Sequence, residues 1–268
     1  MIKNSGDSAA LLGFVRSLNG LWAFFPRAKT AKLIKSLLDL FEEIGNESAL
    51  LIEIELCNEL LQWCETEKRT FLKQALETRL IALFHRTGQY SEALSLLSDV
   101  LRQLKRLDDK SALIEVHLLE SKIYFALKNV AKARASLTAA RTFSNSMYTL
   151  PVVQAALDMQ AGLLHAEELD FKTAFSYFIE CFDNYVNAQL DTRGTQALKY
   201  ILLCKIMLGL PEEVDTILNG KIGQHYPFNS NFEAMQAVAQ SCIEKSLKSF
   251  EKVLQTYPTG AYCFFFVF

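Results

Sequence analysis

The sequence is poor in the two residues that most often interrupt helices. Glycine occurs 11 times and proline 5 times among 268 residues, and residues 46–87 contain neither. Folds built from strands and turns need frequent turn residues, so this scarcity disfavours them. Half of the residues are hydrophobic and 22% are charged, which is typical of an ordinary globular chain. The expected fold class is all-α.

A large excess of charge of either sign is also missing. Lys and Arg number 28 against 30 Asp and Glu, so the chain has no general attraction for nucleic acid or anionic lipid. No uninterrupted apolar run approaches the ~20 residues that span a bilayer. Arg16 and Asn19 interrupt the apolar stretch at residues 9–25, which lacks the cleavage pattern of a secretory signal. We therefore expect a cytoplasmic and nuclear protein without nucleic-acid or membrane partners.

The familiar motifs of catalysis and metal binding are absent as well. The six cysteines form no CxxC pair and no clustered framework, which indicates neither a zinc site nor a disulfide scaffold. There is no Ser-His-Asp order, no HExxH and no glycine-rich phosphate loop. We expect a protein that is not an enzyme and needs neither a cofactor nor a metal.

What the sequence does contain is an internal repeat. Small residues recur at intervals of 40, 41 and 40 residues, at Ala93, Ala133, Ala174 and, more weakly, Val214. Three residues before them stand Tyr90, Val130, Phe171 and Pro211, and nine before them stand Phe84, Tyr124, His165 and Lys205. Two helices that touch need a small residue at the contact and bulky residues beside it. The period therefore predicts a stack of helix hairpins.

The clearest copy of the repeat is "GQYSEAL", residues 88–94. We expect Gly88 to ease the end of one helix, Tyr90 to pack at the turn, and Ala93 to permit close approach of the two helices. Ala133, Phe171 and Ala174 are the corresponding packing residues of the next two copies. The pattern resembles tetratricopeptide repeats, whose unit of 34 residues is shorter by one to two helical turns. It predicts a right-handed solenoid of irregular tetratricopeptide-like hairpins.

Signals of helix boundaries extend this prediction along the chain. Asp108 and Asp109 can cap a helix that begins near Lys110, Pro151 suits a first helical position, and Gly209 with Pro211 marks an end followed by a new start. Helices are also expected at residues 28–44 and 48–66, and a further pair at 231–256. The predicted organisation is one solenoid over residues 1–257. A divergent apolar tail, "AYCFFFVF", would end the chain within residues 258–268.

Three groups of side chains are candidates for function. His165 precedes several acidic residues, but its repeat position, shared with Phe84 and Tyr124, predicts a side chain in helix packing. Cys57 and Cys64 lie one heptad apart and predict part of a buried stripe. Two helix faces are basic: Arg102, Lys105 and Arg106 form one, and Lys29, Lys32 and Lys35 form the other. Such a face is either solvated or docks an acidic protein partner.

Four longer stretches carry a resemblance to a known family. They are "EKRTFLKQALETRL" from Glu67, the segment from Leu101 to Tyr148, "DFKTAFSYFIECFDNY" from Asp170 and "ALKYILLCKIML" from Ala197. Together they resemble the PCI-family scaffold subunits of the proteasome regulatory-particle lid, over roughly residues 20–257. Signalosome subunits are similar in the "F-K-T-A" and "L-K-Y" segments, whereas the stretch from Leu118 to Tyr148 favours the lid.

The resemblance implies a non-catalytic scaffold in ubiquitin-dependent protein degradation. The implied partners are other lid subunits, the ATPase ring and the outer ring of the core particle. No catalytic residues are known in the family, so none are assigned here. Compared with the family, the chain is expected to lack the earliest repeats and the winged helix. The alternatives are a signalosome-type PCI subunit and a generic tetratricopeptide adaptor that binds peptides.

Overall fold

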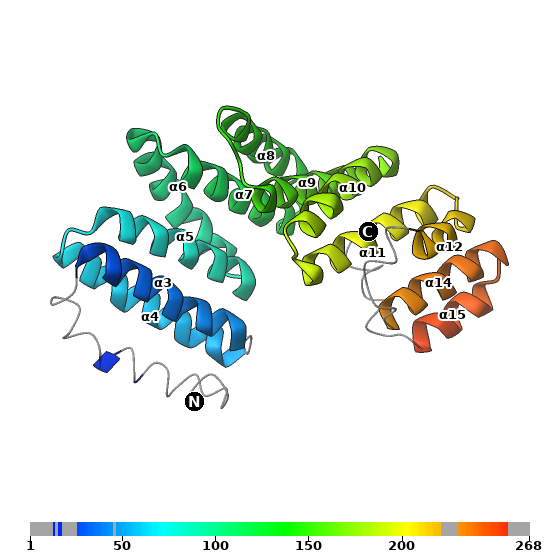
Figure 1. Cartoon of the computed structure of the whole chain (residues 1–268), viewed down its shortest axis with the longest axis horizontal. Coiled ribbons are helices and arrows are strands. Elements are labelled where there is room, and N and C mark those ends of the chain that lie inside the picture. Colours follow the sequence, from blue (N-terminus) through cyan, green and yellow to red (C-terminus); the bar gives the residue numbers. More distant parts are fainter. Residues whose placement is uncertain (1–12, 14–15, 18–25, 45–46, 221–229, 257–268) are drawn as a thin grey trace. The chain divides into compact units, whose positions relative to one another are not determined.

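The computed structural model of the chain describes residues 13, 16–17, 26–44, 47–220 and 230–256, and the predicted apolar tail lies outside them. All regular structure in these ranges is helical, which confirms the all-α class (Figure 1). None of the described helices has the length and apolarity that a membrane span requires. The chain divides into two compact units, Met1–Asp108 and Asp109–Phe268, and each is described by itself below.

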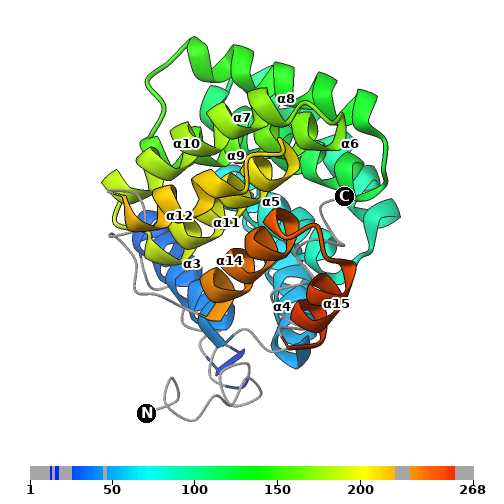
Figure 2. The same ribbon diagram turned by 90° about the vertical axis from the view of Figure 1, so that its right-hand side faces the viewer.

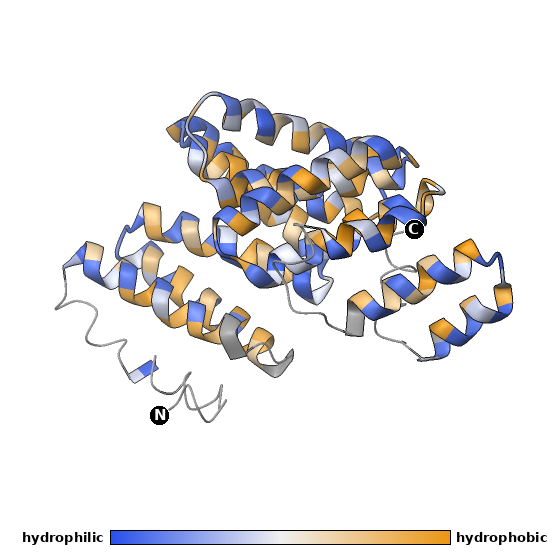
Figure 3. Cartoon of the chain, turned by 45° about the vertical axis from the view of Figure 1, so that its right-hand side comes forward, coloured by the Kyte–Doolittle hydropathy of each residue, from blue (hydrophilic) through white to orange (hydrophobic). Residues whose placement is uncertain are grey.

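Between residues 27 and 107, the first unit contains four described helices that pack in sequence order. They are α3 (Arg27–Ile44), α4 (Glu47–Thr66), α5 (Thr70–Thr87) and α6 (Tyr90–Leu107). Cys57, Leu60 and Cys64 are at most 3% exposed, so the predicted buried stripe on α4 is confirmed. Each helix in Figure 3 carries both hydrophobic and hydrophilic residues along its length, as expected of helices with one face in a core.

An arginine on α5 joins three helices of the first unit. Arg79 donates from Nε to Glu53 Oε1 on α4 at 2.6 Å, and from Nη1 to Asp39 Oδ1 on α3 at 2.7 Å. Its Nη2 donates to the Leu38 carbonyl at 2.7 Å. Burial opposes the charge of Arg79, but the hydrogen bonds to Glu53 and Asp39 outweigh it and raise its pKa. Since Glu53 is only 1% exposed, this arginine compensates a buried carboxylate.

The second unit consists of helix hairpins with a short final pair. Its helices are α7 (Lys110–Ala126), α8 (Val130–Asn145), α9 (Pro151–Glu167), α10 (Phe171–Asn187), α11 (Asp191–Met207), α12 (Glu212–Asn219), α14 (Ser230–Ile243) and α15 (Leu247–Thr256). Consecutive helices from α7 to α12 pack on each other, and α14 lies beside α15 (Figure 2). The predicted solenoid of hairpins is thus the observed arrangement within this unit.

The expected helix boundaries are confirmed in detail. The Asp109 carboxylate accepts the Ala112 N–H and caps α7, and Pro151 is the first residue of α9. After α11, Gly209 adopts the left-handed conformation and Pro211 is the N-cap of α12. Each of these residues acts within a few positions of its own place in the chain, through a side-chain cap at Asp109 and through backbone geometry at the others, which is why the sequence alone located it.

The anchors of the repeat are completely buried at the start of every second helix. Ala93, Ala133, Ala174 and Val214 each have 0% exposure. In the first three copies, the residue three positions earlier opens the helix, as Tyr90, Val130 and Phe171 do for α6, α8 and α10. The anchor N–H in these copies bonds to the carbonyl four residues back, whereas the Val214 N–H bonds to Pro211 instead. The fourth copy is therefore looser in structure as well as in sequence.

The turns repeat more often than the side-chain pattern does. Left-handed residues occur at intervals of 20, at Lys68, Gly88, Asp108 and Lys128 and again at Leu169, Gln189 and Gly209. Apart from the connection between α8 and α9, where no residue of this kind occurs, both turns of a 40-residue unit therefore have the same backbone form. The sequence indicated this form only at Gly88 and Gly209, because glycine alone adopts it without steric cost. At Lys68, Lys128 and Leu169 the turn overrides residue preference.

The same wide backbone hydrogen bond recurs at four hairpin turns. Its donors are the N–H groups of Gln89, Asn129, Asp170 and Leu210, and its acceptors are the carbonyls of Phe84, Tyr124, His165 and Lys205, at 2.9 to 3.1 Å. The acceptors are the residues nine positions before each anchor. This bond satisfies a carbonyl that the end of a helix leaves free, as in a Schellman cap.

One glycine matters because of close packing and not because of its backbone angles. A Cβ built on Gly162 in α9 would lie 2.5 Å from Cε1 of Phe178 in α10. Phe178 is fully buried, so its ring has little room to move. Gly162 therefore allows α9 and α10 to approach each other.

Replacing Gly162 with alanine is expected to destabilise the second unit by about 1–3 kcal/mol through overpacking. Urea denaturation followed by far-UV circular dichroism measures the change. The smaller side chain of F178L relieves the clash. The loss of stability from F178L to G162A/F178L should therefore be smaller than the loss from the wild type to G162A. An equal cost in both backgrounds would contradict the proposed contact.

Candidate interaction surface

The sequence-predicted packing residues lie at helix junctions and not in a cleft. The side chains of Ala93, Ala133 and Ala174 are inaccessible to solvent, while Tyr90 and Phe171 are half-buried at the first residues of α6 and α10. Gly88 is exposed and ends α5 with φ of +77°. None of the six has a titratable group suited to chemistry at neutral pH. Their places are those of structural joints between helices.

His165 occupies its repeat position but is less buried than expected. Its side chain is 28% exposed, and its ring stacks on Tyr177 of α10 with centroids 5.4 Å apart. Its Nδ1 lies 3.7 Å from Asp170 Oδ2, which is too long for a hydrogen bond. The contact with α10 agrees with the predicted place of this side chain in the packing between helices.

The cysteines offer no reactive thiol among the buried positions. Burial raises the pKa of Cys57, Cys181 and Cys204 to about 12 and that of Cys64 to about 11. A thiolate is the nucleophilic form, so these groups are unreactive at neutral pH. Within the described ranges, no group of three or more His, Cys, Asp and Glu side chains could hold a metal ion.

The basic face predicted on α6 is exposed to solvent. Arg102, Lys105 and Arg106 are all exposed, and Arg102 lies 3.5 Å from the exposed Asp99 carboxylate. Lys105 and Arg106 stand in the last turn of α6, where cations interact favourably with the helix dipole. Both a solvated face and a docking face fit this placement, so partner contact stays a prediction. Lys29, Lys32 and Lys35 on α3 are likewise exposed.

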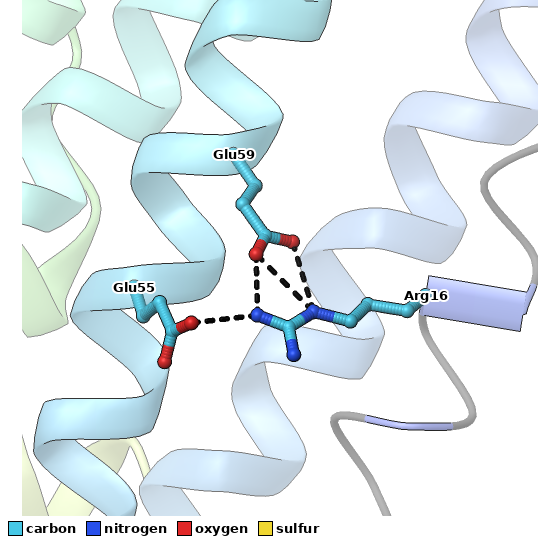
Figure 4. A network of polar contacts seen from close by, with 3 residues as sticks. All are labelled: Arg16, Glu55 and Glu59. Atoms are coloured by element: carbon cyan, nitrogen blue, oxygen red, sulfur yellow. Dashed lines mark hydrogen bonds and ion pairs between the residues drawn. The ribbon is translucent and has the colours of Figure 1, made fainter.

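A second charged cluster joins residue 16 to α4 (Figure 4). Arg16 Nη2 lies 2.6 Å from Glu55 Oε1, and Arg16 Nε donates to both carboxylate oxygens of Glu59 at 3.2 Å. The hydrogen bonds to Glu59 and then to Glu55 raise the pKa of Arg16. The sequence does not reveal this contact, because Glu55 and Glu59 lie 39 and 43 residues after Arg16 in the chain.

Exposed apolar residues are a surface feature that the repeat pattern did not predict. At the hairpin turns of the second unit, Leu127, Leu169 and Leu210 are 46%, 70% and 44% exposed. The first two turns are neighbours, because Lys128 Nζ lies 3.0 Å from Glu167 Oε1. Another apolar group, with Tyr148 83% exposed, lies between α8 and α9. Exposed apolar groups of this kind are typical of protein contacts.

The second unit also carries a cation in an unusual place, on α7. Lys122 is half-buried, and burial lowers its pKa, as does the charge of Arg193 on α11. It stands eleven residues before the anchor Ala133, and the corresponding residues of the next two copies are Leu163 and Leu203. The attraction of Glu115 opposes the shift without reversing it. A position suited to leucine therefore holds a lysine at an electrostatic cost.

Replacing Lys122 with leucine is expected to stabilise the second unit by about 0.5–1 kcal/mol. The lowered pKa means that folding disfavours the ammonium, so its removal relieves a cost at every pH below that pKa. Thermal unfolding at neutral pH measures the gain. The matched control is Lys172→Leu on the exposed side of α10, which should be near neutral. A loss of stability in K122L would contradict the unfavourable setting of Lys122.

Comparison with known proteins relates the chain to one family. Residues 1–87 match the sequence model of the 26S proteasome regulatory subunit RPN6 N-terminal domain. The match lies within the first compact unit. It covers α3, α4 and α5, including the helices that Arg79 joins.

Curated relatives extend the similarity over nearly the whole chain. The probable 26S proteasome regulatory subunit rpn6 of Schizosaccharomyces pombe is 46% identical over 247 residues, which are 92% of the chain and 58% of the relative. The 26S proteasome non-ATPase regulatory subunit 11 homolog of Arabidopsis thaliana is 45% identical over 90% of the chain and 56% of its own length. The subunit RPN6 of Saccharomyces cerevisiae is 43% identical over 87% and 54%. The chain thus spans little more than half the length of these relatives.

Proposed function

The chain belongs to the RPN6 family of 26S proteasome regulatory subunits, and from this premise we propose that it is a non-catalytic scaffold segment of the regulatory-particle lid. It supports assembly and ubiquitin-dependent protein degradation through contacts with other lid subunits, the ATPase ring and the outer ring of the core particle. Its place of action is the cytoplasm and the nucleus. The observation that supports this proposal most strongly is the 46% identity, over 92% of the chain, with a protein named as a probable 26S proteasome regulatory subunit.

The character of the described surface supports a scaffold. The buried thiols are unreactive, and the small repeat anchors are buried where helices pack. The exposed features are basic helix faces and apolar turn residues, which suit protein contacts. The similarity to proteasome subunits favours the lid over a signalosome complex or a generic peptide adaptor.

Affinity purification tests the proposed complex. The chain is expressed with a tag in cells that contain intact proteasomes, and the bound proteins are identified by quantitative mass spectrometry. Lid subunits should be enriched relative to a tagged chain carrying Ala93→Glu, which disrupts the fold of the first unit. Recovery of signalosome subunits without lid subunits would overturn the proposal.

Charge reversal tests whether the basic face of α6 takes part in assembly. The triple variant R102E/K105E/R106E should recover fewer lid subunits if this face docks an acidic partner. The variant K29E/K32E/K35E on α3 makes the same charge change on the other exposed basic face. Loss of recovery with only the first variant assigns the contact to α6, and unchanged recovery with the first variant excludes it.

A further inference from the structure

The hairpin α7–α8 meets the hairpin α9–α10 along α8 and α9. Within the described residues, three ion pairs join the two hairpins, and in each the cation belongs to α7–α8: they are Arg141–Asp158, Arg134–Glu168 and Lys128–Glu167. Late residues of α8 thus pair with early residues of α9, and the start of α8 lies beside the end of α9. The two helices are antiparallel, so their joint has a connected end, at residues 146–150, and an open end without a covalent link.

Buried polar groups fix the connected end. Arg141 donates from Nη2 to Asp158 Oδ1 and from Nη1 to the Tyr177 hydroxyl of α10, both at 3.0 Å. The Asp158 side chain is only 3% exposed, and salt screens partly buried pairs less than exposed ones. Across the connection itself, the Ser144 and Thr149 hydroxyl oxygens lie 2.9 Å apart. This end can therefore act as a pivot.

The open end is held by charges that reach the solvent. Lys128 Nζ lies 3.0 Å from Glu167 Oε1, and these side chains are 64% and 22% exposed. Arg134 pairs with Glu168, the C-cap of α9, and these side chains are 49% and 37% exposed. Exposed ion pairs stabilise a structure weakly and lose strength as salt is added.

Apolar packing is also weaker toward the open end. The buried residues of α8 are Ala133, Ser136, Leu137, Ala140 and Ser144. Only Leu137 is large, and it lies in the middle of the helix. The buried residues that α7 adds to the same cluster, Ile114 and Leu118, lie in the half of α7 nearer the connected end. By contrast, α10 buries Phe178 and Phe182 in the neighbouring cluster. Smaller side chains bury less apolar area, so the open end of the joint has little besides its ion pairs.

We propose that the joint between α8 and α9 is a salt-sensitive clasp. The hairpin α7–α8 turns about the connected end when the ion pairs at the open end are screened or replaced. A partner protein that offers charges to Lys128 and Arg134, or to the two glutamates, would favour the open form because it binds that form better. The clasp is a property of the second unit alone, so it does not depend on whether the chain joins the lid.

Double electron–electron resonance on the full chain measures the opening. Spin labels are attached to Ala135→Cys on α8 and Ser176→Cys on α10, two exposed positions that are equivalent in their repeats. The exposed Cys242 is replaced with serine, as is Cys263. A control pair, S176C with Gln196→Cys on α11, reports the neighbouring joint. From about 0.05 M to about 1 M NaCl the Debye length falls to ~3 Å. The distances between 135 and 176 should lengthen and broaden, whereas those of the control pair should not change.

Charge variants at low salt test the ion pairs themselves. K128E/R134E should give the open distribution without added salt, because both pairs become repulsive. The full exchange, K128E/R134E/E167K/E168R, restores opposite charges and should return the closed distribution. Lys132→Glu is the matched control on α8, since Lys132 lies over the Tyr124 ring of its own hairpin. It should leave the distances unchanged.

Three results would overturn the clasp. They are distances between 135 and 176 that do not respond to salt, an equal response of the control pair, and an open distribution that persists in the full exchange. The last would mean that the substitutions act through lost packing and not through charge. Should K128E/R134E fail to fold, the salt titration of the labelled wild-type joint still decides.

Discussion

Ala93→Glu is expected to destabilise the first unit by roughly 3–5 kcal/mol. Ala93 has 0% exposure at the start of α6, where that helix packs against α5. A glutamate there would bury a charge without a partner or force the two helices apart. Both outcomes remove apolar contacts along the whole hairpin, so the effect should be among the largest that a single substitution produces in this chain.

Tryptophan fluorescence during urea denaturation measures this loss selectively. Trp63 lies on α4 in the first unit, and residues 109–268 contain no tryptophan. The control is Gln89→Ala, since Gln89 is exposed and contributes its backbone carbonyl, not its side chain, to the Ala93 N–H. This variant should stay within about 0.5 kcal/mol of the wild type. An unchanged midpoint for A93E would refute the close-packed joint.

Arg79→Met is expected to cost a similar amount, about 3–5 kcal/mol, for an electrostatic reason. The substitution keeps most of the volume of the side chain but removes the cation that holds the Glu53 carboxylate at 2.6 Å. Glu53 is 1% exposed, so the change removes a hydrogen-bonded cation from a carboxylate buried inside the first unit. The bonds to Asp39 and to the Leu38 carbonyl on α3 are lost at the same time.

Two further variants separate these contributions. Asp39→Ala removes the partner whose side chain is 63% exposed and should cost at most about 1 kcal/mol. The double variant R79M/E53L replaces the buried pair with apolar groups and should recover most of the stability that R79M loses. If R79M cost no more than D39A, the buried carboxylate would not be the source of the effect. The same tryptophan signal reports all three variants.

The repeat was predictable because its requirements are local. Each small anchor residue, the apolar residue three positions before it and the N-cap one position earlier lie within one turn of a helix start. Asp109, Pro151 and Gly209 act on their own backbone or their near neighbours, and the structure shows each of them in that role. The family resemblance has the same basis, since it rests on stretches that span single hairpins.

Other features depend on residues that the chain brings together from far apart. Arg79 donates hydrogen bonds to partners 26, 40 and 41 residues away, so no short sequence pattern predicts these bonds. Gly162 looks like a weak point in α9 until Phe178 is placed against it. His165 is explained by its backbone carbonyl, which closes a turn, more than by its imidazole. The ion pairs between α8 and α9 likewise need residues from two hairpins.

By itself, the sequence determined that this protein is an all-α stack of hairpins with a period near 40 residues, because the size of each packing residue and the chemistry of each cap are local properties. Only the tertiary structure decided which charges are paired and which stay available. Ion pairs and pockets are formed by groups from different helices, and their energies depend on distance and burial, which the order of residues along the chain does not contain.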